Sequence, residues 1–118
     1  MRRSKLNSDS AILPSVDGGC GVLHRPDQRM FLIRLEPGSY AFVKYEIVGN
    51  KLYITRTYTP EKFRGRGLAS RLTERVVLWA KERGFKVVPV CSFAISFFKK
   101  RRDLHYLLDE EALETLNL

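Results

Sequence analysis

The sequence lacks most features of a membrane, secreted or metal-binding protein. Its 118 residues contain two cysteines, Cys20 and Cys91, which lie far apart and form no C-x-x-C pair. Such cysteines favour neither a disulfide framework nor a zinc site, so we expect no bound metal. No apolar run approaches the roughly 20 residues that cross a bilayer, and no apolar segment follows the basic start of the chain. These absences predict a cytoplasmic protein without a membrane partner.

The composition is that of an ordinary globular domain. Hydrophobic residues make up 44% of the chain and charged residues 29%, which does not indicate disorder. A chain of this length suits one domain with a thin core, so we expect a sheet layer and a helix layer. Residues 1–17 are polar and without periodicity, which predicts a flexible N-terminal tail. Residues 18–118 are the predicted domain, and its first residues, Gly18 to Gly21, predict a turn.

The net charge of +8 is unevenly distributed along the chain. Residues 62–102 hold twelve Lys or Arg and two Glu, whereas residues 103–118 hold five acidic residues and no Lys or Arg. A basic segment of this kind indicates an anionic partner, which is nucleic acid, an acidic surface or a phosphate-rich cofactor. Charge alone does not choose among these three.

The first half of the chain predicts an antiparallel meander. β-Branched and aromatic residues are concentrated in runs that Pro, Gly and Asn separate, as in consecutive strands joined by short turns. These runs are residues 30–33, 40–48 and 52–58.

From residue 60 onward the apolar spacing becomes helical. Apolar residues from Leu68 to Ala80 fall on one face, where Trp79 is expected to join the core, and Gly84 is expected to end the helix. The apolar run that follows predicts a strand parallel to the one before the helix, because a strand–helix–strand crossover joins them. The predicted strand covers residues 85–90, and shorter helices are predicted for residues 92–100 and from residue 109 onward.

The most informative segment joins the third predicted strand to the first helix. Gly65 and Gly67 have no side chains, so an anion can approach the backbone closely at the positive end of the helix dipole. Arg64 and Arg66 add full charges beside them. The segment therefore predicts a phosphate-binding loop, although it has neither the Gly-Lys-Ser/Thr ending of a P-loop nor the three glycines of the dinucleotide fingerprint.

The pattern Arg64-x-x-Gly67-x-Ala69 resembles the Q/R-x-x-G-x-G/A motif of the Gcn5-related N-acetyltransferases. Over about residues 20–108 the chain is similar to the minimal, single-domain members of that superfamily. The resemblance implies an α/β fold with a mixed, mostly antiparallel sheet, a central splayed parallel strand pair and packed helices. It also implies that the backbone of Tyr58 contacts the pantetheine arm of acetyl-CoA, and that Pro89 faces the gap between the splayed strands. The residues implied in pyrophosphate binding are Arg64, Gly65, Arg66, Gly67, Leu68, Ala69 and Ser70.

The resemblance implies acetyl transfer from acetyl-CoA to an amine whose identity the sequence does not give. Many relatives place an Asn before the second helix and a Tyr within it as general acid. With Ala94 aligned to the family's helix alanine, Cys91 and Phe98 occupy these two positions, so the usual acid is missing. Tyr106 or a water molecule is the alternative acid. Cys91 has three open roles, as a nucleophile, as part of the cleft lining or as a core residue.

Two rival functions stay open, and both lack turnover. The chain is either an acyl-CoA-binding module or a basic nucleic-acid-binding module that uses residues 62–102. We find no RNP-like aromatic motif and no GXXG loop, so only weak and non-specific nucleic-acid binding is expected. The basic run Lys99 to Arg102 fits a solvated helix end, a nucleic-acid patch or a contact to cofactor phosphates. His24 and His105 are predicted to be structural.

Overall fold

The computed structural model of the chain describes residues 21–118; the predicted tail and most of the turn after it lie outside these residues. The described part is an α/β domain with one five-stranded sheet. The strands are β2 (Val22–Arg25), β3 (Met30–Glu36), β4 (Ser39–Val48), β5 (Lys51–Tyr58) and β6 (Lys86–Pro89). The α-helices are α1 (Leu68–Arg83), α2 (Ser92–Lys100) and α3 (Glu110–Thr115), and short 3-10 helices cover Pro26–Gln28, Glu61–Phe63 and Arg102–Leu107.

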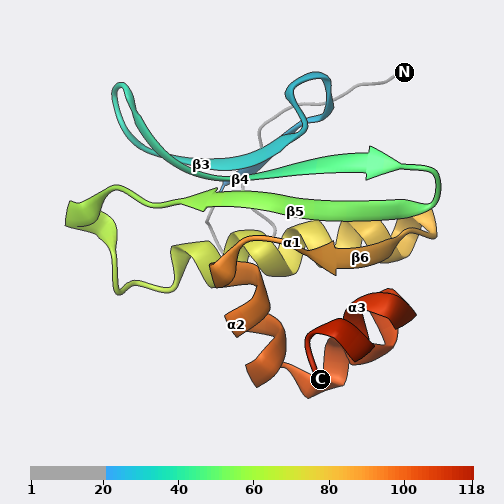
Figure 1. Cartoon of the computed structure of the whole chain (residues 1–118). Coiled ribbons are helices and arrows are strands. Elements are labelled where there is room, and N and C mark those ends of the chain that lie inside the picture. Colours follow the sequence, from blue (N-terminus) through green and yellow to red (C-terminus); the bar gives the residue numbers. More distant parts are fainter. Residues whose placement is uncertain (1–20) are drawn as a thin grey trace.

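The sheet has the mixed pairing that the sequence predicts. β2, β3, β4 and β5 pair antiparallel in chain order, and β6 pairs parallel to β5 after the α1 crossover. Figure 1 shows α1 running along β5 and β6, with α2 and α3 beyond β6. The meander, the parallel pair and the ends of α1 are therefore confirmed.

Two details of the sheet differ from expectation. The parallel pair is not central among the described strands, because β6 ends the strand order and its outer edge bonds to the segment around Leu108 instead of another strand. The amide of Asp109 donates to the carbonyl of Val87 at 2.9 Å. The strand β2 was not predicted, since four residues that include His24 and Arg25 carry too little apolar periodicity to signal a strand.

Helix α1 packs its apolar face on the sheet and ends at a glycine. Leu72, Val76, Val77 and Ala80 are fully buried in the core. Gly84 takes the left-handed conformation (φ 79°) and its amide bonds back to the last carbonyls of the helix, which is the common way for a helix to end. The helix is thereby fixed in length and in its orientation along β5.

A cluster of buried and partly buried aromatic rings joins β2, β3, β4 and α1. The His24 ring stacks on Phe31 with centroids 4.0 Å apart, and its Nε2 lies 2.6 Å from the hydroxyl oxygen of Tyr45. The edge of Trp79 approaches the same imidazole at 4.7 Å between centroids. Burial, helped by the nearby Arg83 charge, lowers the pKa of His24 from 6.5 to about 4, and burial raises the pKa of Tyr45 to about 12. Both side chains are therefore neutral at pH 7, as in a packed core.

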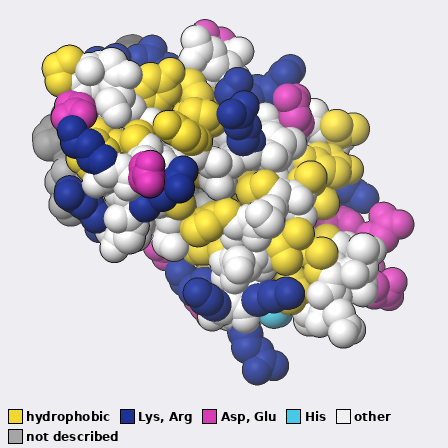
Figure 2. All heavy atoms as spheres, turned by 60° about the vertical axis from the view of Figure 1, so that its left-hand side comes forward, with side chains coloured by type: hydrophobic (Ala, Val, Ile, Leu, Met, Phe, Trp, Pro, Cys, Tyr) yellow, Lys and Arg dark blue, Asp and Glu magenta, His cyan; other side chains and the backbone are white. Residues whose placement is uncertain are grey.

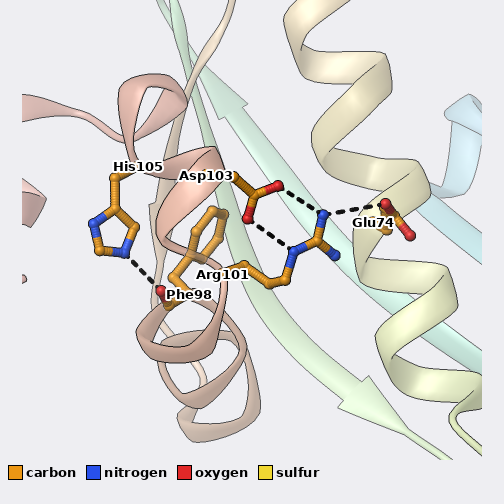
Figure 3. A network of polar contacts seen from close by, with 5 residues as sticks. All are labelled: Glu74, Phe98, Arg101, Asp103 and His105. Atoms are coloured by element: carbon orange, nitrogen blue, oxygen red, sulfur yellow. Dashed lines mark hydrogen bonds and ion pairs between the residues drawn. The ribbon is translucent and has the colours of Figure 1, made fainter.

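A second polar network fastens the end of α2 to α1 (Figure 3). The Arg101 guanidinium donates to both carboxylate oxygens of Asp103 at 3.0 Å and to Glu74 on α1 at 3.4 Å. His105 places Nε2 2.6 Å from the carbonyl oxygen of Phe98. Arg101, one of the four consecutive basic residues at the end of α2, thus forms ion pairs within the protein.

The His24 environment predicts a pH-dependent stability. Between pH 6.5 and about 4 the unfolded chain binds a proton at His24 that the folded chain does not, so the free energy of unfolding falls as the pH falls through this window. After allowing for solvent screening, we expect a loss of about 1–2 kcal/mol. Urea unfolding at pH 7 and pH 4.5 measures it. His24→Gln should flatten this dependence while the control His105→Gln retains it; equal pH dependence in the parent and His24→Gln would contradict the assignment.

Candidate functional site

The candidate site begins where the parallel pairing of β5 and β6 stops. The last paired residues are Ile54 and Pro89, while β5 continues to Tyr58. The amides of Val90 and Cys91 both donate to the carbonyl oxygen of Ile54, at 3.0 and 3.2 Å, and the chain then turns into α2. The edge of β5 beyond Ile54 therefore has no β6 partner.

The bonds from β6 to β5 come from the amides of Lys86 and Val90, whereas the carbonyl of Val87 faces the outer edge. The position of the missing Pro89 N–H is therefore on the outer edge and not, as expected, on the side of the gap, so it costs no bond to β5.

The loop from β5 to α1 has two glycines in left-handed conformations. Gly65 has φ 84° and Gly67 has φ 77°, values that side chains disfavour. A Cβ atom built at either glycine would meet no other atom within 4 Å. Glycine is favoured at these two positions by the backbone conformation and not by a lack of space for a side chain. The space in front of the loop is open.

The N-terminus of α1 faces this open space without a cap. Gly67 is the N-cap residue and offers no side-chain acceptor, and the first turn contains no Asp or Glu. The first bond of the helix runs from the Arg71 amide to the Gly67 carbonyl at 3.1 Å, so the amides of Leu68, Ala69 and Ser70 have no carbonyl partner within the helix. Free N–H groups and the positive end of the dipole together favour an anion here.

An open pocket of about 520 Å³ lies between the end of β5, this loop and the start of α2. Seven of the eight residues that the sequence assigned to the cofactor line it, namely Tyr58, Arg64, Gly65, Gly67, Leu68, Ala69 and Ser70. Four further lining residues were not assigned from the sequence, namely Thr57, Thr59, Phe63 and Phe93. Three of them flank the assigned residues in the chain, so a wider window around the loop would have found them. Phe93 belongs to α2, and only the tertiary fold brings it to the pocket.

Comparisons with known proteins identify the family. Residues 30–107 match the family model described as GCN5-related N-acetyl-transferase. The chain belongs to this family. It is 34% identical over 89 residues to Protein NATD1 of Danio rerio, an alignment that covers 73% of this chain and 80% of NATD1. The fold is similar to the NMR structure of a GCN5-like candidate N-acetyltransferase from Staphylococcus aureus, with a TM-score of 0.63 and 23% identity over 78% of this chain and 90% of the other.

Family membership supports a general N-acetyltransferase function. Within the loop, the two arginines Arg64 and Arg66 have different surroundings. Arg64 lines the pocket and its Nε donates to the carbonyl oxygen of Thr59 at 3.0 Å, which braces the loop. Arg66 instead lies over the Phe63 ring, with its guanidinium carbon 5.2 Å from the ring centroid, and it is not among the pocket-lining residues. Arg64 is therefore the better placed of the two to contact a bound anion.

The residues considered for proton or acyl transfer in this N-acetyltransferase lie away from the pocket lining. Cys91, a free thiol, is partly buried and packs against the core, and Phe98 is fully buried. Tyr106 is exposed beneath Lys81, whose Nζ lies 5.6 Å from its ring centroid. Lys81 is in the last turn of α1, about 20 Å along the helix from Leu68. The fold thus gathers the residues that the sequence assigned to the cofactor and leaves Tyr106 at the far end.

Figure 2 shows one face of the molecule, on which Lys and Arg side chains lie around an apolar band. Acidic side chains gather at the right-hand edge, and others lie among the basic ones. Within residues 21–118, no group of three or more His, Cys, Asp or Glu is arranged to hold a metal ion. A helix long and apolar enough to cross a membrane is also absent from this range.

Proposed function

We propose that the chain transfers an acetyl group from acetyl-CoA to an amine. The observation that carries the proposal is the early end of the β5–β6 pairing at Ile54 and Pro89, which leaves a free strand edge next to the pocket. An extended arm with amide groups can pair with such an edge as a further strand would. Family membership supports the same use of the gap.

The uncapped start of α1 fits the pyrophosphate of coenzyme A. The amides of Leu68, Ala69 and Ser70 supply donors, and the missing side chain of Gly67 lets phosphate oxygens reach them. Arg64 adds a charge-assisted donor at the rim of the pocket. The backbone of Tyr58, at the end of the unpaired edge, would contact the pantetheine arm.

The pocket lining supplies hydroxyl groups but no side-chain base. Thr57, Tyr58, Thr59 and Ser70 line it, and none of its lining residues is His, Asp, Glu or Cys. Acetyl transfer forms a C–N bond and breaks the C–S bond of the thioester, while a proton leaves the nitrogen and the sulfur regains one. We infer that water carries both protons, because Phe98 replaces the usual tyrosine and Tyr106 lies far away.

A second candidate is acyl-CoA binding without turnover, and the absence of an ionisable base among the lining residues favours it. Both candidates bind the acyl-CoA in the same pocket, and only the first one transfers the acetyl group. Release of free coenzyme A in the presence of a panel of amines, followed with a thiol reagent, separates them.

Acetyl-CoA should stabilise the protein under both candidates. At a hundredfold excess over the dissociation constant, mass action adds roughly 2.7 kcal/mol, which raises the Tm by about 10 °C or more for a domain of this size. Differential scanning fluorimetry measures the shift. An acetyl thioester of cysteamine, which has no pyrophosphate, should shift the Tm far less. No shift at millimolar acetyl-CoA would refute the cofactor assignment.

Two glycines with the same backbone conformation give a matched test of the loop. Gly67 and Gly84 lie at opposite ends of α1 with φ 77° and 79°, and a Cβ atom at either meets open space. Gly67→Ala and Gly84→Ala should therefore cost similar stability, about 1–2 kcal/mol each. Only Gly67→Ala places a methyl group before the free amides, so it should weaken coenzyme A binding tenfold or more by calorimetry. Equal affinities in the two variants would show that the loop does not hold the cofactor.

Substitutions at Cys91 separate its three roles. Its packing against the core and its absence from the pocket lining favour a supporting role over a nucleophilic one. A supporting role in the core predicts that Cys91→Ser and Cys91→Ala both keep most turnover. A role in the cleft lining predicts that Cys91→Ser keeps turnover and that Cys91→Ala changes mainly cofactor affinity. A nucleophile predicts the opposite, with both variants inactive and an acetyl group on Cys91 after incubation with acetyl-CoA alone. Intact-protein mass spectrometry, with and without hydroxylamine, detects that adduct.

A further inference from the structure

The side chains of β4 alternate between the core and an open face of the sheet. Ala41, Val43 and Tyr45 are buried in the core, so the intervening Tyr40 and Phe42 point to the other side. Residues directly opposite in the register share a face. The register also places the buried Met30 and Leu32 on this side. The other six residues are what we call the aromatic–basic face: Arg34, Tyr40, Phe42, Lys44, Arg56 and Tyr58.

Three rings of the aromatic–basic face form a continuous row. The Phe42 centroid lies 6.1 Å from that of Tyr40 and 5.4 Å from that of Tyr58. Tyr40 and Tyr58 are 41% and 42% exposed, so part of each ring is accessible to a ligand. The Arg56 guanidinium carbon lies 5.8 Å from the Phe42 centroid. Rings and cations therefore lie together on one surface.

This face carries three exposed cations, Arg34, Lys44 and Arg56, beside the rings. Glu46 follows Lys44 on the same side of β4, and it binds Arg29 at 3.1 Å. Glu36 at the end of β3 binds Lys62 at 3.0 Å. Charge complementarity therefore calls for an anionic partner, and the rings call for one with flat apolar surfaces.

We propose that the aromatic–basic face binds single-stranded nucleic acid. Bases stack on exposed rings without sequence preference, and Lys or Arg beside the rings contact the phosphates. A duplex keeps its bases stacked on one another, and an acidic peptide would use the cations without the rings. The proposed site is independent of the acetyl-CoA pocket, apart from Tyr58, whose ring belongs to this face and whose residue also lines the pocket.

Fluorescence anisotropy with a labelled 15-nucleotide oligo(dT) tests the aromatic half of this proposal on the full chain. Tyr40→Ala should weaken binding about fivefold or more, the usual cost of losing one stacking ring, and Tyr40→Phe should restore it. Tyr106→Ala is the matched control, since Tyr106 is also exposed and lies beneath a lysine. Equal weakening by Tyr40→Ala and Tyr106→Ala, or equal binding of the duplex, would overturn the proposal.

The salt dependence tests the cationic half. Replacing Arg34, Lys44 and Arg56 together by Gln should reduce the slope of log affinity against log salt by about 2, because each phosphate contact contributes about 0.7. The control replaces three exposed basic residues at the end of α2 by Gln, a change of equal charge: Lys99, Lys100 and Arg102. The control should keep the parent slope. Equal slopes in the two triple variants, or displacement of the oligonucleotide by polyglutamate at equal charge concentration, would overturn the proposal.

Discussion

The rest of the structure depends on two hydrogen bonds to one carbonyl group. The Ile54 oxygen accepts the amides of Val90 and Cys91, and it does so where the chain leaves β6 for α2. These bonds end the parallel ladder and direct α2 away from β5. The free edge of β5 and the position of Phe93 in the pocket both follow from that turn.

Helix α1 links this turn to the anion site through its glycine ends. Gly67 and Gly84 take nearly the same left-handed conformation, but their surroundings differ. At Gly84 the amide is bonded back to the helix, whereas at Gly67 the following amides are left without helical partners. The C-terminal glycine stabilises the fold, and the N-terminal one leaves donors available to a ligand. The same residue type therefore closes the helix at one end and leaves amides free at the other.

The two faces of the sheet have different chemistry. The inner face carries the neutral His24–Tyr45 pair and the aliphatic core, and the start of α1 forms one wall of the pocket. The opposite side carries the aromatic–basic face, with its rings and exposed cations. Tyr58 lies at the boundary, since β5 ends there and the residue belongs to both surfaces. A partner on the aromatic–basic face would therefore lie next to the end of the pocket.

Local sequence determined the elements, the glycine loop and the family. Strand runs separated by Pro and Gly, the helical spacing from Leu68 to Ala80 and the Arg64-x-x-Gly67-x-Ala69 pattern depend on residues close in the chain, which is why they were predictable. Long-range packing decided what the sequence could not show. Contacts between distant segments pair Val87 with Leu108 and place Tyr106 near the C-terminal end of α1. A side-chain rotamer places Arg66 over the Phe63 ring. No short-range pattern encodes these choices, because each is settled by whichever neighbour the finished fold supplies.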